Sequence, residues 1–195
     1  MIIDLRYNGG GLVDVAVHLG SLIGGAVTNG QVFAVFQHND KNDALNETLR
    51  FESKPEALTL PRLFVITTRA SASASELLVN SLRAYMPVTV IGDATYGKPV
   101  GQYGFPFCDK VLAPVSFKLV NANGEGDYFG GIPADCPAAD DVENDLGTAE
   151  EASLREALTV IRTGSCSTPR TTSQSLRVTA SRIRVTGWQS VINAY

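Results

Sequence analysis

The sequence has few of the side chains that bind transition metals. It contains two histidines, His18 and His38, and three cysteines, Cys108, Cys136 and Cys166, with no Cys-x-x-Cys pair. Zinc sites take their ligands mainly from histidine and cysteine at close, regular spacing. A zinc site is therefore not expected, and no metal or other cofactor is predicted.

Long apolar runs are also absent. No stretch of about 18 apolar residues occurs, so no transmembrane helix is expected. The apolar run at the N-terminus is short and is interrupted by Asp4, which predicts a strand and not a signal peptide. Because the chain enters a strand at once, we expect further sequence to precede residue 1 in the natural protein.

Basic residues are scarce in most of the chain. The sequence has 16 lysines and arginines against 20 acids, for a net charge of −4. Nucleic-acid binding needs a concentrated basic surface, so a nucleic-acid partner is not expected. Residues 163–195 differ, because they are rich in Ser and Thr and hold four arginines and no acid. We predict a domain over 1–162 and a tail over 163–195, with one late strand from Leu176 to Trp188.

The three cysteines leave two interpretations open. Cys108 and Cys136 form a disulfide if the protein resides in an oxidising compartment. The alternative is three thiols that never pair. The sequence does not choose between these two states.

An apolar fraction of 44% is enough for the core of one domain. Hydrophobic periodicity predicts strands at 2–5, 32–36, 63–67 and 88–92, and helices at 12–23, 71–85 and 148–161. Residues 111–128 predict a hairpin around Asn123-Gly124, and residues 38–60 predict a hairpin or an irregular excursion. Strands alternating with helices indicate an α/β fold, with helices packed on a sheet.

The segment Ser71–Glu76 (SASASE) follows a predicted strand and begins a predicted helix. A serine there lies near the positive end of the helix dipole, where unpaired N–H groups can stabilise an oxyanion. Serine needs a base, and Lys98 can be that base if burial lowers its pKa. Taken separately, the two residues have plainer interpretations, a helix cap and a solvated loop lysine.

Taken together, these residues resemble the carboxy-terminal processing (tail-specific) protease family of Ser–Lys serine peptidases. The opening Ile3–Leu12 (IDLRYNGGGL) is similar to a glycine-rich segment of that family. The 25-residue separation of Ser73 and Lys98 matches the family, and Gly130–Asp135 resembles a later Gly-Ile-x-Pro-Asp element. The resemblance covers 1–162. The peptide-binding PDZ module that is usual in the family is not visible.

The resemblance implies a crotonase-like spiral core of β-sheets with packed helices. It implies that Ser73 is the nucleophile, that Lys98 is the general base and that Gln102 orients the lysine. Glu76 then has a supporting role. The backbone N–H groups of Ala74 and of Gly10 or Gly11 would form the oxyanion hole.

The expected activity is therefore cleavage of peptide bonds through an acyl-enzyme, with a polypeptide as the substrate. The resemblance also implies an exported protein, periplasmic or membrane-associated, without obligatory membrane insertion. Two alternatives remain: a non-catalytic module that binds a peptide or apolar ligand, and a Ser–Lys esterase or amidase. The joint presence of Ser73, Lys98 and Gln102 favours an enzyme. The sequence leaves the oligomeric state open.

Two other groups have plainer interpretations. The acidic cluster at 140–145 lacks the spacing of a calcium loop and is interpreted as a solvated approach to a helix. His18 falls beside Leu19 on a predicted helix, which favours a structural role.

Overall fold

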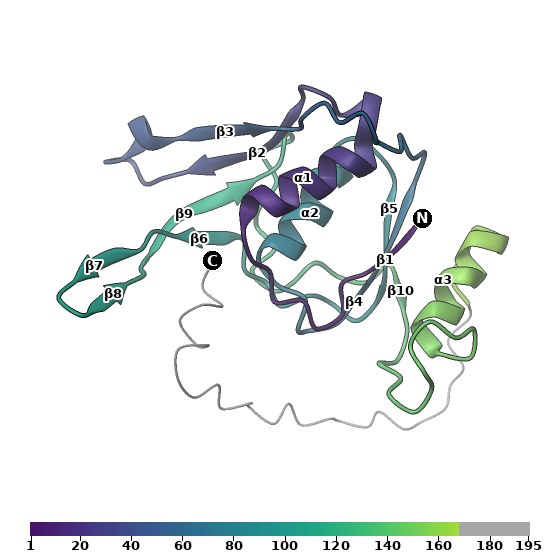
Figure 1. The fold of residues 1–195 in the computed structure, drawn as a ribbon. Coiled ribbons are helices and arrows are strands. Elements are labelled where there is room, and N and C mark those ends of the chain that lie inside the picture. Colours follow the sequence, from purple (N-terminus) through teal and green to yellow (C-terminus); the bar gives the residue numbers. More distant parts are fainter. Residues whose placement is uncertain (168–195) are drawn as a thin grey trace.

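The computed structural model describes residues 1–167. The predicted strand from Leu176 to Trp188 lies outside the described residues. Figure 1 shows two sheets on either side of a pair of helices, with a third helix on the far side of one sheet. Within residues 1–167, no helix has the length and apolar character needed to cross a membrane.

The first sheet is parallel throughout. Its strand order is β1 (Ile2–Asp4), β4 (Leu63–Thr67), β5 (Val88–Gly92) and β10 (Cys136–Pro137). Every residue of β4 is buried, as expected for a parallel strand covered on both faces. The first three strands confirm the sequence prediction. The two-residue β10 was missed because Cys-Pro carries no strand pattern.

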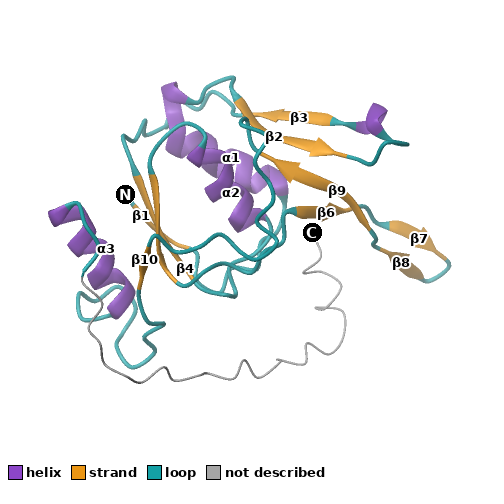
Figure 2. Ribbon diagram, turned by 180° about the vertical axis from the view of Figure 1, so that it is seen from behind, coloured by secondary structure: helices purple, strands orange, loops and turns teal. Residues whose placement is uncertain are grey.

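The second sheet is antiparallel, with the order β3 (Glu47–Arg50), β2 (Val32–Gln37), β9 (Val115–Val120) and β6 (Val100–Gln102). β2 and β3 form a hairpin, so the 38–60 region supplies its loop and second strand, while its first strand lies before that region. Between β6 and β9 the chain forms a separate two-stranded hairpin, β7 (Phe105–Phe107) and β8 (Lys110–Leu112). Figures 1 and 2 show this hairpin projecting from the body of the protein.

The hairpin predicted for 111–128 is wrong in its second strand. The turn itself forms, because the Asn121 N–H donates to the Glu125 carbonyl at 2.9 Å and Gly124 takes a φ of 78°. No strand follows this turn, however. β9 pairs instead with β2 on one edge and β6 on the other, so neither edge remains for a local partner.

The three α-helices are α1 (Val13–Gly24), α2 (Ala74–Arg83) and α3 (Ala152–Thr163). α1 ends at its glycines as predicted. α2 is shorter than the predicted 71–85, because residues before Ala74 form a hydrogen-bonded turn. α3 begins after the predicted residue 148, since the Glu151 side chain accepts hydrogen bonds from the N–H groups of Ser153 and Leu154 and caps the helix there.

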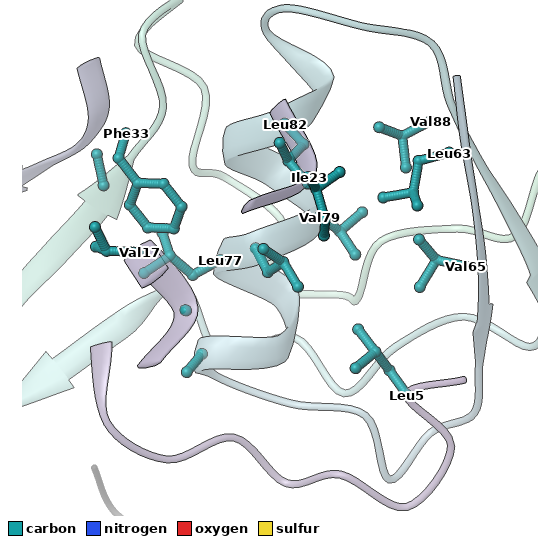
Figure 3. Packing of buried hydrophobic residues seen from close by; sticks show 14 of the residues in the cluster. Leu5, Val17, Ile23, Phe33, Leu63, Val65, Leu77, Val79, Leu82 and Val88 are labelled. Atoms are coloured by element: carbon teal, nitrogen blue, oxygen red, sulfur yellow. The ribbon is translucent and has the colours of Figure 1, made fainter. Parts of the chain in front are cut away.

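The main core lies between the two sheets and surrounds α2. Figure 3 shows Phe33 of β2 and Leu77 of α2 on one side, and Leu63 and Val65 of β4 on the other. The intervening Phe64 points to the opposite face, where α3 packs. This alternation is the period of a β-strand. α2 is therefore held by both sheets, which fixes the position of its N-terminus.

Both interpretations of the cysteines, a Cys108–Cys136 disulfide and three unpaired thiols, are wrong. Cys136 of β10 is bonded to Cys166, which follows α3, and Cys108 is an exposed free thiol. Cys108 lies at the turn of the projecting β7–β8 hairpin. α3 instead returns the chain across the outer face of the parallel sheet, which brings Cys166 to β10. The pairing thus follows from the packing of α3.

Candidate active site

Ser73 lies at the junction between the loop after β4 and the helix α2. It is the N-cap of α2, is only 4% exposed, and has a φ of 56° and a ψ of −118°. A serine at positive φ is strained by about 1–3 kcal/mol and persists only where its surroundings impose that conformation. Strain of this kind concentrates at functional sites. The structure thus singles out Ser73 within the SASASE segment.

Neighbouring serines hold this turn in place. The Ser71 hydroxyl donates to the Leu5 carbonyl at 2.7 Å and accepts from the Thr68 N–H at 3.0 Å. The Ser75 hydroxyl donates to the Asn8 carbonyl at 3.1 Å. The SASASE segment is therefore tied directly to the chain that follows β1, and its flanking serines have structural roles.

The glycine-rich loop after β1 lies against Ser73. Gly10 has a φ of 103°, and a Cβ added there would lie 2.7 Å from the Ser73 Cβ and 2.8 Å from the Ala72 carbonyl oxygen. Only glycine permits this approach. The Gly10 N–H donates to the Asn8 Oδ1 at 3.0 Å. The Gly11 N–H has no acceptor among residues 1–167.

A buried carboxylate joins the segments that carry Ser73 and Lys98. The Glu76 side chain is inaccessible to solvent, and its Oε2 accepts from the Ser73 N–H at 2.9 Å and the Lys98 N–H at 2.8 Å. Its Oε1 accepts from the Gly97 N–H at 2.7 Å and the Thr95 hydroxyl at 2.5 Å. One side chain therefore fixes the backbone of both residues relative to each other. The family resemblance implied only a general supporting role for Glu76.

The segment before Lys98 is anchored a second time. The Tyr96 N–H donates to the Ser71 carbonyl at 2.9 Å, and the Thr95 N–H donates to the Ile132 carbonyl at 3.0 Å. The Ile132 N–H returns a hydrogen bond to the Thr95 hydroxyl at 2.7 Å. The GGIPAD segment thus supports the loop that carries the lysine, which the sequence motif alone did not indicate.

Lys98 is partly buried, as its small and apolar neighbours predict. Desolvation lowers the pKa of Lys98 below the usual lysine value, and the Glu76 carboxylate partly opposes this by raising it. Burial disfavours the charged ammonium. A larger fraction of neutral amine is therefore present near neutral pH than for a solvated lysine.

Gln102 lies in β6, four residues after Lys98. Its side-chain Nε2 donates to the Ala113 carbonyl at 2.5 Å, next to the start of β9. This contact connects β6 with the root of the β7–β8 hairpin. The orientation of Lys98 by Gln102 stays a prediction.

Tyr7, which the sequence did not single out, links the glycine-rich loop to the acidic cluster. Its hydroxyl donates to the Asp140 Oδ1 at 2.6 Å, and this hydrogen bond raises the pKa of Tyr7 to about 12. Tyr7 also takes a φ of 62°. A strained backbone conformation is not visible in a sequence pattern, so no signal could have marked this residue.

One group within residues 1–167 has ligand atoms close enough to hold a metal ion: Cys136, Glu156 and Cys166. The two sulfurs are bonded to each other, so neither offers a thiolate. The group lies by α3, on the face of the parallel sheet opposite α2. It therefore does not belong to the Ser73 site.

Comparison with solved structures supports an enzyme scaffold. A putative S41 protease from Bacteroides fragilis aligns with a TM-score of 0.76 and 30% identity, over 84% of this chain and 45% of that chain. The photosystem II D1 C-terminal processing protease aligns with a TM-score of 0.58 and 22% identity, over 74% of this chain and 36% of that chain. The second likeness shows the fold alone.

Curated protein sequences that resemble this chain are likewise named as proteases. A carboxy-terminal-processing protease of Bartonella bacilliformis is 30% identical over 111 residues, which are 53% of this chain and 24% of that protein. A probable CtpA-like serine protease of Staphylococcus haemolyticus is 26% identical over 140 residues, 71% of this chain and 27% of that protein. The chain thus spans about a quarter of the length of these relatives. The model of peptidase family S41 matches residues 1–137, and the chain belongs to that family.

Proposed function

We propose that this chain carries the catalytic centre of a serine endopeptidase in which Ser73 is the nucleophile and Lys98 the general base. The observation that carries the proposal is that the Glu76 carboxylate accepts hydrogen bonds from the backbone N–H groups of both residues. A nucleophile and a general base must first be held within reach of each other and of the substrate. Only then do their pKa values affect the rate. A single buried anchor for both backbones supports this assignment.

The reaction proceeds in two stages. The Ser73 Oγ attacks the scissile carbonyl while the neutral Lys98 amine takes its proton, and the tetrahedral intermediate then expels the amine, which receives that proton from Lys98. Water next attacks the Ser73 ester, with Lys98 again accepting a proton, and releases the acid. The proton returns to the Ser73 oxygen when the ester breaks.

The oxyanion is held by backbone N–H groups. Ala74 is the first residue of α2, where the helix dipole favours negative charge. Gly11 is the second donor in this proposal, because the Gly10 N–H is already committed to the Asn8 side chain. Each such donor contributes roughly 10²–10³ in rate.

The wider assignments remain proposals. We infer a crotonase-like spiral core, a catalytic domain over 1–162 and a separate tail over 163–195. The Cys136–Cys166 disulfide supports an exported protein, because structural disulfides persist mainly in oxidising compartments. The names of the relatives support a polypeptide substrate.

Substitution of Ser73 tests the proposal. Hydrolysis of an unfolded protein and of an activated ester is measured for the wild type, for Ser73→Ala and for the control Ser75→Ala. We expect Ser73→Ala to lose at least about 10³-fold in rate on the preferred substrate, whereas Ser75→Ala retains most activity. Activity on the ester alone would indicate an esterase or amidase. Full activity in Ser73→Ala would exclude the Ser–Lys assignment, and peptide binding without turnover would indicate a binding module.

The pH dependence tests the base. Lys98 must be neutral to accept a proton, so kcat/KM should rise with pH and level off above the pKa of Lys98. Because burial lowers that pKa, the rise should be centred below the ordinary lysine value of about 10.4. Below the centre, kcat/KM should fall about tenfold per pH unit. A profile unchanged in Lys98→Met would contradict the assignment.

A further inference from the structure

The β7–β8 hairpin exposes apolar side chains on both of its faces. Phe105 pairs with Leu112 across the hairpin, and Phe107 shares their face, while Val111 lies on the other face. All four are exposed, and Phe107 is 74% exposed. A two-stranded hairpin has no core of its own, and clustered exposed apolar side chains mark a binding surface.

The root of this hairpin is fixed to the body. The Gln102 Nε2 donates to the Ala113 carbonyl, and the Tyr103 N–H donates to the Ser116 hydroxyl at 3.1 Å. The Tyr103 hydroxyl also lies 3.1 Å from the His38 Nε2, and the two rings stack. These contacts fix the position of the hairpin on the body of the protein. Residues 105–112 are called the arm below.

The arm begins beside the proposed catalytic lysine. β6 starts two residues after Lys98 and leads through Tyr103 into β7. β6 is also the outer strand of the antiparallel sheet, so one of its edges has no strand partner within residues 1–167. An exposed strand edge can accept an extended peptide through main-chain hydrogen bonds. The edge and the apolar arm thus follow one another along the chain, and both begin within a few residues of Lys98.

We propose that the β7–β8 hairpin is a docking arm for apolar segments of an unfolded polypeptide substrate, a role that rests on the proposed peptidase function. An unfolded polypeptide exposes both apolar side chains and main-chain hydrogen-bonding groups, which match the arm and the β6 edge. Compact folded proteins hide both.

Other occupants fit less well. A stable dimer interface takes about 20–30 residues from each side, far more than residues 105–112 provide. The charges of the arm, Asp109 and Lys110, form an ion pair with each other at 3.2 Å. The arm therefore has no net charge to attract an anionic lipid surface.

Binding can be measured independently of catalysis. The full chain with Ser73→Ala is titrated with fluorescein-labelled, reduced and carboxymethylated lactalbumin, a permanently unfolded polypeptide, and anisotropy gives Kd. Adding Phe105→Ser and Phe107→Ser should raise Kd at least about tenfold, since two apolar anchors are lost. The matched control adds Val27→Ser and Leu58→Ser, two exposed apolar side chains away from the arm, and should leave Kd unchanged.

Turnover separates the arm from the catalytic centre. With Ser73 intact, the Phe105→Ser/Phe107→Ser variant should lose at least about tenfold in kcat/KM on the unfolded protein. Its hydrolysis of a small activated ester should stay within about twofold of the wild type. Equal losses on both substrates would show a structural role for the arm and overturn the proposal. If Ser73→Ala leaves hydrolysis intact, the Ser73–Lys98 assignment fails while the binding titration still decides the role of the arm.

Cys108 provides a second readout at the turn of the arm, because the other two cysteines are joined in a disulfide. An environment-sensitive fluorophore on its thiol should change emission saturably as the unfolded lactalbumin is added. Unchanged emission together with unchanged Kd would overturn the proposal. The proposal would also be overturned if sedimentation showed that the arm holds two copies of the chain together, or if the chain bound vesicles through the arm.

Discussion

The N-terminus of α2 and the β7–β8 hairpin lie on either side of Lys98 in the chain and are built in opposite ways. Around Ser73, the side chains are buried and one carboxylate takes four hydrogen bonds. In the hairpin, every residue of both strands is exposed. The first region holds its backbone in one arrangement through buried hydrogen bonds, which suits the proposed nucleophilic chemistry. The second leaves apolar surface in water, where it can meet a partner.

The difference has an energetic reason. A hydrogen bond to a buried carboxylate is strong, and leaving any of its donors unpaired costs about 1–3 kcal/mol. An exposed apolar side chain contributes little to folding, because its surface meets water before and after folding. Changes in the first region should therefore reduce both stability and catalysis, whereas changes in the second should affect binding alone.

The largest combined effect on stability and activity should follow Glu76→Gln. The amide keeps the shape but places an N–H group against backbone N–H donors, so we expect a loss of about 3 kcal/mol in unfolding free energy and about 10² in kcat/KM. Urea unfolding and hydrolysis of the activated ester measure the two losses. The control is Glu151→Gln, another buried carboxylate, which binds Arg6 at 2.8 Å. The Glu151→Gln variant should lose stability and keep its kcat/KM. Equal losses of kcat/KM in the two variants would contradict a positioning role for Glu76.

The second effect concerns the opposite face of the parallel sheet. Replacing Cys136 and Cys166 by serine opens a loop that joins positions 30 residues apart, and should cost about 3–4 kcal/mol of unfolding free energy. Chemical denaturation without reductant measures this loss. Cys108→Ser should leave the denaturation midpoint unchanged, because that thiol is unpaired and exposed. A shifted midpoint for Cys108→Ser would show that the hairpin contributes to folding.

A smaller effect distinguishes two adjacent glycines. Gly10→Ala places a Cβ against Ser73 and Ala72 at a positive φ, and should cost about 1–3 kcal/mol through strain together with part of the activity. Gly9→Ala meets no atom within 4 Å and should change neither quantity. Thermal unfolding and ester hydrolysis compare the pair. Equal behaviour of the two variants would contradict the close approach of this loop to Ser73.

The smallest effect should appear in the hairpin. Phe107→Ser should change the unfolding free energy by less than about 0.5 kcal/mol, because the ring is 74% exposed. Phe33→Ala, in the fully buried core, should cost about 3–5 kcal/mol. Denaturant titration of both variants measures the contrast. A large loss for Phe107→Ser would mean that the hairpin is a folded element that supports the body.

Local sequence patterns predicted the parts of the fold that local physics controls. The apolar runs at 63–67 and 88–92 form central strands, and the glycines after Ile23 end α1 as expected. The predicted second strand after Asn123-Gly124 failed, because both edges of β9 are taken by strands distant in the chain. Edge occupancy is a property of the whole sheet and leaves no local pattern.

The features of the candidate site also separate into those predicted from the sequence and those that only the structure shows. The SASASE segment, the 25-residue spacing to Lys98 and the family resemblance that they carry predicted Ser73 as the nucleophile and Lys98 as the base. The close approach of Gly10 to Ser73 and the hydrogen bonds that Glu76 accepts from residues 95–98 come from segments brought together by folding. No spacing rule encodes which donors meet at one carboxylate.

The sequence by itself determined the class of fold, the segments that carry the serine and the lysine, and the family resemblance. All of these rest on residue identity and short-range order. The tertiary structure decided which cysteines pair and which strand, β6, pairs with the second edge of β9. It also decided how Glu76 joins two loops. These features depend on distances between residues far apart in the chain, which are set only when α2 and α3 pack on the parallel sheet.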